Sequence, residues 1–187
     1  MPPSAPTPTE SLAVPVSEVD HARGELNAPI TLVQYGDYEC PDCAAAFPVV
    51  ARLREALGTQ LRFVFRNFPQ NSIHPHASVA AQAAEAAGAQ GKFWPMHDLL
   101  YAHQATLADH SMDEFALKLG LEIYKFNADL SSERFARRVR EDFDGGQRSG
   151  VKGTPTFFIN SQRYRGEVAY EPMLAAIETV LRSATTT

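Results

Sequence analysis

The chain has 187 residues, which fits one ordinary domain, or one domain with a sizeable insertion, that folds without a metal or a disulfide. Its composition, 44% hydrophobic and 21% charged, excludes an intrinsically disordered, collagenous or coiled-coil chain. With 17 basic and 22 acidic residues the net charge is -5, so no overall positive field attracts nucleic acid or anionic membranes, and neither is an expected partner.

The N-terminal segment MPPSAPTPTESLAVPV is rich in proline, serine and threonine. It has no cationic start and no apolar run of about 7 to 15 residues, so it lacks the pattern of a secretory signal. We therefore expect residues 1–24 to form a flexible tail and the protein to be cytoplasmic. No apolar run reaches the roughly 18 residues that a membrane-spanning helix needs.

Three predicted elements follow this tail. The apolar string ITLVQYG after Pro29 suits a buried strand. From Pro41 onward apolar residues recur at helical spacing until Gly58, which predicts a helix. In LRFVFRNF, from Leu61, the alternating pattern predicts a second strand. The order is a β-α-β unit with a pair of cysteines at the start of its helix.

The stretch from Pro69 to about Gly150 has no strand signal and a helical pattern throughout. We expect helices over residues 76–87, 95–103 and 131–147, with shorter ones beginning near Met112 and Leu121. The strand pattern returns in TPTFFIN and QRYRG, on either side of a turn at residues 160–161. A closing helix is predicted from about residue 170 to residue 181.

Cys40 and Cys43 are the only two cysteines in the chain. Their spacing closes too small a loop to stabilise a fold, and in a cytosolic chain it predicts redox chemistry. Unpaired N–H groups at a helix start stabilise a thiolate, so we expect Cys40 to be the exposed nucleophile. Cys43, one turn later and facing inward, can attack the mixed disulfide, while Pro41 keeps the turn rigid.

Two other interpretations of the cysteine pair are a pair of inert apolar residues and half of a zinc site. Two ligands are too few for zinc, and His74, His76, His97, His103 and His110 show none of the usual ligand spacings. We therefore predict neither a metal nor a cofactor. The strings around His74 and His97 are expected to serve as helix caps and inter-helix packing.

Several long strings are similar to those of the DsbA-like, thioredoxin-fold disulfide oxidoreductases: VQYGDYECPDC, FRNFP, IHPHASVAAQAAEAAGAQGKFWPMHDLLYAHQ and RSGVKGTPTFFIN. The resemblance implies an α/β thioredoxin fold with an inserted all-helical subdomain. Its first half is expected over residues 25–67, the helical insertion over 68–150 and the second half over 151–184.

The resemblance also implies an activity: exchange of disulfides with protein, peptide or small-thiol substrates through Cys40 and Cys43, supported by a thiol electron donor. Reduction is the expected direction in a reducing cytosol. The string GTPT matches the family loop whose cis-proline faces the cysteine pair and whose backbone edge pairs with the substrate. Thr154 and Pro155 are thus expected to bind substrate, with Thr154 contacting the reactive sulfur.

Two departures from the family pattern bear on the chemistry. Asp42 stands where members often have His, Tyr or Phe, and Asp37 and Glu39 add two carboxylates with no Lys or Arg between residues 36 and 51. Nearby negative charge raises a thiol pKa, so we expect the Cys40 pKa to exceed that of strongly oxidising relatives. Gln34 stands where the family has a buried acid that moves protons for the inner cysteine.

Two further functions compete with disulfide exchange. Glutathione-dependent transferases and isomerases also occur on this scaffold, but they generally lack the second cysteine, which Cys43 supplies here. A non-catalytic module, in which the helical insertion holds a peptide and the cysteines sense redox state, is the other alternative.

Overall fold

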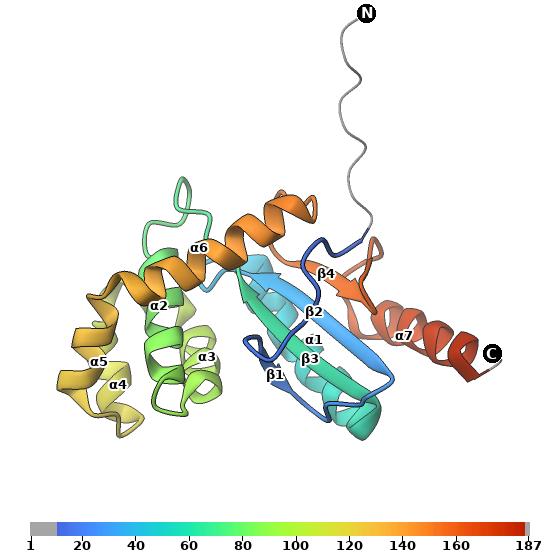
Figure 1. The fold of residues 1–187 in the computed structure, drawn as a ribbon, viewed down its shortest axis with the longest axis horizontal. Coiled ribbons are helices and arrows are strands. Elements are labelled where there is room, and N and C mark those ends of the chain that lie inside the picture. The colour runs from blue at the N-terminus through green and yellow to red at the C-terminus, as the bar shows by residue number, and fades with distance from the viewer. Residues whose placement is uncertain (1–10, 186–187) are drawn as a thin grey trace, which may run out of the picture.

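The computed structural model describes residues 11–185 and has a five-stranded mixed sheet at its centre, in the order β1-β3-β2-β4-β5 (Figure 1). Strands β2 (Ile30–Gly36) and β3 (Leu61–Asn67) are parallel. Helix α1 (Pro41–Leu57) and a short 3-10 turn, η1 (Gly58–Gln60), connect them. The predicted β-α-β unit is therefore confirmed, with the cysteine pair between β2 and the first turn of α1.

The second half of the sheet lies on the other side of β2. Strand β4 (Thr156–Ile159) pairs antiparallel with β2, and β5 (Gln162–Arg163) pairs antiparallel with β4. Asn160 and Ser161 both have positive φ values, 44° and 69°, in the tight turn between them. Helix α7 (Tyr170–Thr185) closes the described chain.

Both faces of the sheet are covered. Leu32 of β2 lies in one core cluster with Leu53 of α1 and Met173 of α7. Its neighbour Val33 points to the opposite face, where it packs in a second cluster with Leu12 from the N-terminal segment. A strand buried on both faces has an almost continuous apolar sequence, as β2 does.

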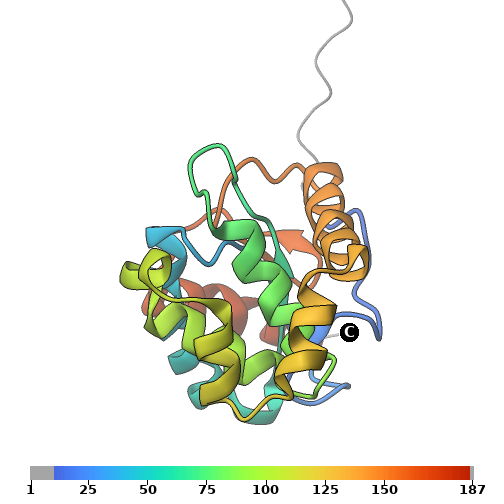
Figure 2. The same cartoon turned by 90° about the vertical axis from the view of Figure 1, so that its left-hand side faces the viewer.

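Five helices and a 3-10 turn separate β3 from β4: α2 (Ala77–Gly88), α3 (Phe93–Ala102), η2 (Gln104–Asp109), α4 (Met112–Lys118), α5 (Ile123–Leu130) and α6 (Glu133–Arg148). Helices α2 to α5 form a bundle beside the sheet, and this bundle faces the viewer in Figure 2. Helix α6 runs from the bundle back to the sheet (Figure 1). The buried alanines of α2 let α3, α5 and α6 all pack closely against it. The predicted helical insertion is confirmed.

The prediction of a flexible tail over residues 1–24 is wrong for residues 11–24, while residues 1–10 lie outside the described residues. Strand β1 (His21–Arg23) adds to the sheet edge antiparallel to β3. Leu12 is buried, and its backbone N–H donates to the carbonyl of Ser161 at 2.8 Å. Tertiary contacts therefore hold residues 11–24 in place, although the composition of this segment alone predicts no ordered structure.

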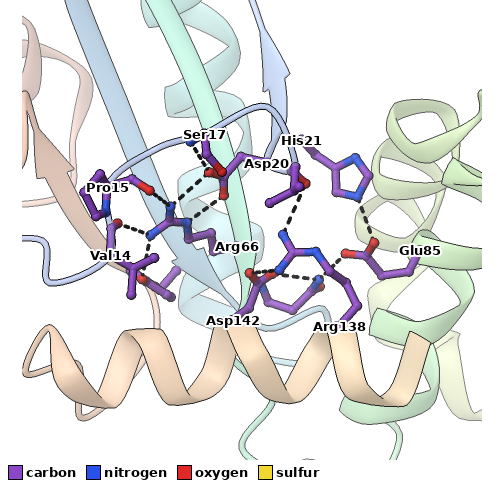
Figure 3. A network of polar contacts seen from close by, with 12 residues as sticks. Val14, Pro15, Ser17, Asp20, His21, Arg66, Glu85, Arg138 and Asp142 are labelled. Carbon is purple, nitrogen blue, oxygen red and sulfur yellow. Dashed lines mark hydrogen bonds and ion pairs between the residues drawn. The ribbon is translucent and has the colours of Figure 1, made fainter. Parts of the chain in front are cut away.

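Arg66 of β3 provides several of those contacts (Figure 3). Its side chain is 3% exposed and donates from Nε to Asp20 Oδ1 at 2.7 Å and from Nη2 to Asp20 Oδ2 at 3.0 Å. Its remaining hydrogen bonds go to the carbonyls of Val14 and Pro15 and to the Tyr35 hydroxyl. Burial raises the pKa of Asp20, but the hydrogen bonds from Arg66 and from the Ser17 backbone N–H, together with the charges of Arg66 and Arg138, keep that pKa below its ordinary value.

A second buried polar cluster, also visible in Figure 3, ties the N-terminal segment to the helical insertion. Glu85 of α2 accepts from His21 Nε2 at 2.9 Å and from Asn67 Nδ2 at 2.8 Å. Asp142 of α6 accepts from the Asn67 backbone N–H at 3.0 Å and pairs with Arg138. The insertion is therefore joined to the sheet by buried, hydrogen-bonded charges as well as by apolar packing.

We predict that Arg66→Met lowers the free energy of unfolding by about 3–5 kcal/mol, because it leaves the Asp20 carboxylate buried without a counter-ion. Urea denaturation of both proteins measures the difference. The matched control is Arg140→Met, which removes an exposed arginine and should cost less than about 1 kcal/mol. Equal losses in the two variants would show that Arg66 does not hold the segment.

Candidate active site

The cysteine pair lies at the carboxyl end of β2, where the chain turns into α1. Cys40 is the N-cap residue of α1, with extended backbone angles of φ -75° and ψ 121°, and Pro41 occupies the first turn. Cys43 lies one turn later and is completely buried. Both cysteines are free thiols. Asp42 is exposed in the first turn between them.

Cys40 is less exposed than the sequence predicted, at only 5%. Its sulfur faces the loop before β4 and, in the protonated thiol form, donates a hydrogen bond to the Thr154 carbonyl at 3.3 Å. Gln104, from η2, donates to the Cys40 carbonyl at 2.7 Å and to the Tyr38 carbonyl at 3.0 Å. Contacts from both the second half of the sheet and the insertion therefore cover the residue. The resemblance led us to expect the contact with Thr154, whereas the contact with Gln104 was not expected.

The two thiols have opposite acid–base properties. A hydrogen bond from the Cys43 thiol lowers the pKa of Cys40 to about 6; the Thr154 side chain and the backbone N–H groups of Cys43 and Asp42 add to this effect, and burial opposes it. Burial raises the pKa of Cys43 well above its ordinary value, and the neighbouring Cys40 sulfur raises it further. At neutral pH Cys40 is thus mostly thiolate, while Cys43 keeps its proton.

Two of the three carboxylates near Cys40 are bound by histidines. Asp37 is buried, and its Oδ2 accepts from His74 Nδ1 and from the Gln70 backbone N–H, both at 2.8 Å. Glu39 accepts from His76 Nδ1 at 2.8 Å and from the His76 backbone N–H at 2.7 Å. These side chains therefore fasten the loop before α2 to the cysteine segment. His76 is the N-cap residue of α2, as expected for this string, but its side chain binds Glu39 and makes no capping hydrogen bond to the helix.

The spacing of these residues carries a signal that the sequence analysis did not use. Asp37 and Glu39 are two residues apart, and so are His74 and His76, which suits two parallel carboxylate–histidine pairs between adjacent segments. No third histidine continues this spacing to pair with Asp42, and Asp42 is the one of the three carboxylates that is exposed.

The loop of Thr154 and Pro155 faces the cysteine pair, and the Thr154–Pro155 peptide bond is cis. The Thr156 hydroxyl donates to the Gly153 carbonyl at 2.8 Å and closes the loop. Gln70 donates from Nε2 to the Thr154 hydroxyl at 3.0 Å. Gln70 was missed by the sequence analysis, although it connects Asp37, on one side of the reactive sulfur, with Thr154 on the other.

Gln34 lies in β2 and is 3% exposed. It lines a cavity of about 150 Å³ between the sheet, α1 and α3, together with Arg23, Arg54 and Asp98. Arg23 donates to Asp98 Oδ2 at 2.6 Å, and the other oxygen, Oδ1, is buried with no hydrogen-bond partner. The cavity that holds the uncharged Gln34 therefore contains a carboxylate from the insertion.

Among residues 11–185, no cluster of three or more His, Cys, Asp or Glu side chains is arranged to hold a metal ion.

Comparison with known proteins connects this geometry to a family. Residues 16–179 match the family model described as Thioredoxin. The chain belongs to the thioredoxin family. Alpha-DsbA1 from Wolbachia pipientis has a similar fold, with a TM-score of 0.80 and 18% identity over 94% of this chain and 96% of that one. Oxidised BdbD from Bacillus subtilis has a TM-score of 0.75 and 24% identity over 86% and 92%. The predicted DsbA-like thioredoxin fold is confirmed.

Curated relatives of this thioredoxin-family chain carry a different name. It is 47% identical over 167 residues to "Na(+)/H(+) antiporter NhaA 1" of Salinispora arenicola, and 40% identical over 169 residues to "Na(+)/H(+) antiporter NhaA" of Herminiimonas arsenicoxydans. These alignments cover 89% and 90% of this chain but 26% and 27% of the relatives. The chain thus spans about a quarter of the length of the curated relatives it matches.

We predict that Cys43→Ala raises the pKa of Cys40 by about one to two pH units, because it removes the thiol that donates to the Cys40 sulfur. The pH dependence of iodoacetamide alkylation, followed by mass spectrometry on prereduced protein, measures the midpoint. Cys43→Ser keeps a hydroxyl donor and should shift the midpoint less. An alanine variant with the wild-type midpoint would contradict this assignment.

Proposed function

We propose that this protein is a thiol–disulfide oxidoreductase that exchanges disulfides with protein or peptide substrates through Cys40 and Cys43. The observation that carries the proposal is the placement of the two thiols, with Cys40 at the start of α1 and Cys43 buried one turn later. This placement lowers the pKa of Cys40 and raises that of Cys43. Disulfide exchange requires one ionised sulfur that attacks and a second sulfur that resolves the mixed disulfide, and Cys40 and Cys43 are suited to these two roles.

The reaction proceeds in two displacements. The Cys40 thiolate attacks one sulfur of the substrate disulfide, and the other substrate sulfur leaves as a thiol. Cys43 then loses its proton and attacks the Cys40 sulfur, which releases the second substrate thiol and leaves a Cys40–Cys43 disulfide. Two electrons pass from the dithiol to the substrate, and a thiol electron donor restores the dithiol.

The proton of Cys43 needs an acceptor for the second displacement. Gln34 cannot ionise, and in the cavity that it lines the carboxylate of Asp98 is the acidic side chain. We propose that water or another side chain takes this proton in place of the buried acid that the family pattern has at position 34. Thr154 and Pro155 are proposed to align the substrate backbone against Cys40.

Reduction in the cytoplasm remains the proposed direction and location. None of the helices in residues 11–185 combines the length and apolar character needed to cross a bilayer. The ion transport named for the curated relatives belongs to proteins of which this chain matches about a quarter. Disulfide exchange is therefore the activity that we propose for this chain.

We predict that the wild-type protein catalyses the reduction of insulin by dithiothreitol and that Cys40→Ser lowers the rate to the uncatalysed background, because the attacking sulfur is lost. Turbidity of the released insulin chain measures the rate. Lys92→Ala, which changes an exposed residue away from the dithiol, serves as the control. Equal rates with wild type and Cys40→Ser would refute the proposed function.

The direction of electron flow has its own test. The reduction potential of the dithiol, measured by equilibration with glutathione, is expected near or below that of the glutathione pool. A potential far above that pool would assign the protein to oxidation of substrates instead.

A further inference from the structure

A groove of about 700 Å³ lies next to the candidate active site, between the loop after β3 and helices α2 and α6. Its apolar lining includes Phe68, Val139 and Val151, each 4% exposed, together with Phe143. Its volume is within the range of about 300–1,000 Å³ that is typical of ligand pockets. None of the steps proposed above uses this groove.

Gln70 and Lys152 connect the groove to the reactive sulfur. Both line the groove. Gln70 donates to the Thr154 hydroxyl at 3.0 Å, and the Thr154 carbonyl accepts from the Cys40 sulfur at 3.3 Å. Lys152 precedes Thr154 by two residues. Because an extended chain advances about 3.3 Å per residue, a substrate segment a few residues from the cysteine held at Cys40 can reach the groove.

The charge of the groove contrasts with that of the whole chain. Arg140 and Lys152 are the charged residues of its lining, and none of the lining residues is acidic, although the chain has a net charge of -5. Arg140 Nη2 lies 3.0 Å from Glu133 Oε2, but the two side chains are 60% and 89% exposed. Such an exposed pair contributes little stability, so a substrate carboxylate can replace Glu133 at little cost.

We propose that this groove binds an extended segment of the substrate protein that carries acidic side chains near its reactive cysteine. Apolar side chains of the segment pack against Phe68 and Phe143, and its carboxylates face Arg140 and Lys152. This inference rests on the proposed function, because exchange at Cys40 is what brings the segment to the groove. It assigns the enzyme a preference among disulfides according to the charge beside the cysteine.

The test uses peptides with one cysteine, each joined as a mixed disulfide to 2-mercaptoethanol, and with acidic, neutral or basic residues on either side. The full-length dithiol reduces each to peptide and mercaptoethanol, while dithiothreitol regenerates the dithiol. We expect kcat/KM for the acidic peptide to exceed that for the basic peptide by about ten-fold at low salt, and the difference to shrink as salt screens it.

Two double variants separate the groove from the overall charge. Arg140→Glu with Lys152→Glu should abolish or reverse the preference for acidic peptides. Arg137→Glu with Lys92→Glu makes the same charge change at exposed positions outside the groove lining and should preserve it. Thermal unfolding followed by circular dichroism checks that all variants are folded.

Equal kcat/KM for acidic and basic peptides in wild type, or the same loss in both double variants, would overturn the inference. If no peptide is reduced, the proposed function fails, and the groove is tested by fluorescence anisotropy with peptides that carry serine in place of cysteine. Tighter binding of the acidic peptide, lost only in the Arg140→Glu/Lys152→Glu variant, supports the groove; equal binding of acidic and basic peptides refutes it.

Discussion

The chemistry of this molecule depends on the hydrogen bond from the Cys43 thiol to the Cys40 sulfur. That bond is the largest contribution to the low pKa of Cys40, and the fold holds both residues in the positions that make it possible. Strand β2 ends shortly before Cys40, and α1 places Cys43 one turn later against the buried core. A helix start alone stabilises a thiolate; here a protonated partner at the same helix end adds to it.

The acidic residues around Cys40 are compatible with this thiolate because the fold gives two of them other partners. His74 and His76 bind Asp37 and Glu39, which keeps both carboxylates hydrogen-bonded and directed toward the loop before α2. The same bonds attach the helical insertion to the reactive segment, and Gln104 attaches it a second time through the Cys40 carbonyl. The insertion is therefore part of the structure that positions the dithiol.

Local patterns in the sequence predicted what depends on local chemistry. Apolar periodicity predicted β2, α1 and β3, and the spacing of the cysteines predicted where the sulfurs lie. The features that these patterns did not predict depend on contacts between distant segments. Arg66, whose position in the sequence suggested the polar face of a strand, holds residues 11–24. Gln70 forms a hydrogen bond with Thr154, which is 84 positions away in the sequence. A buried arginine and an exposed one have the same local sequence signal, so only the assembled fold distinguishes them.

The acidity of Cys40 also bears on the direction of electron flow. A thiolate that is stabilised in the dithiol form makes the disulfide a stronger oxidant. The Cys40 pKa of about 6 lies above the value of about 3.5 in strongly oxidising DsbA. Ionisation therefore stabilises the reduced form less in this dithiol than in DsbA. The lowered pKa of Cys40 still makes this disulfide a stronger oxidant than an unperturbed pair, but a weaker one than strongly oxidising DsbA, in keeping with the reductase direction that we propose.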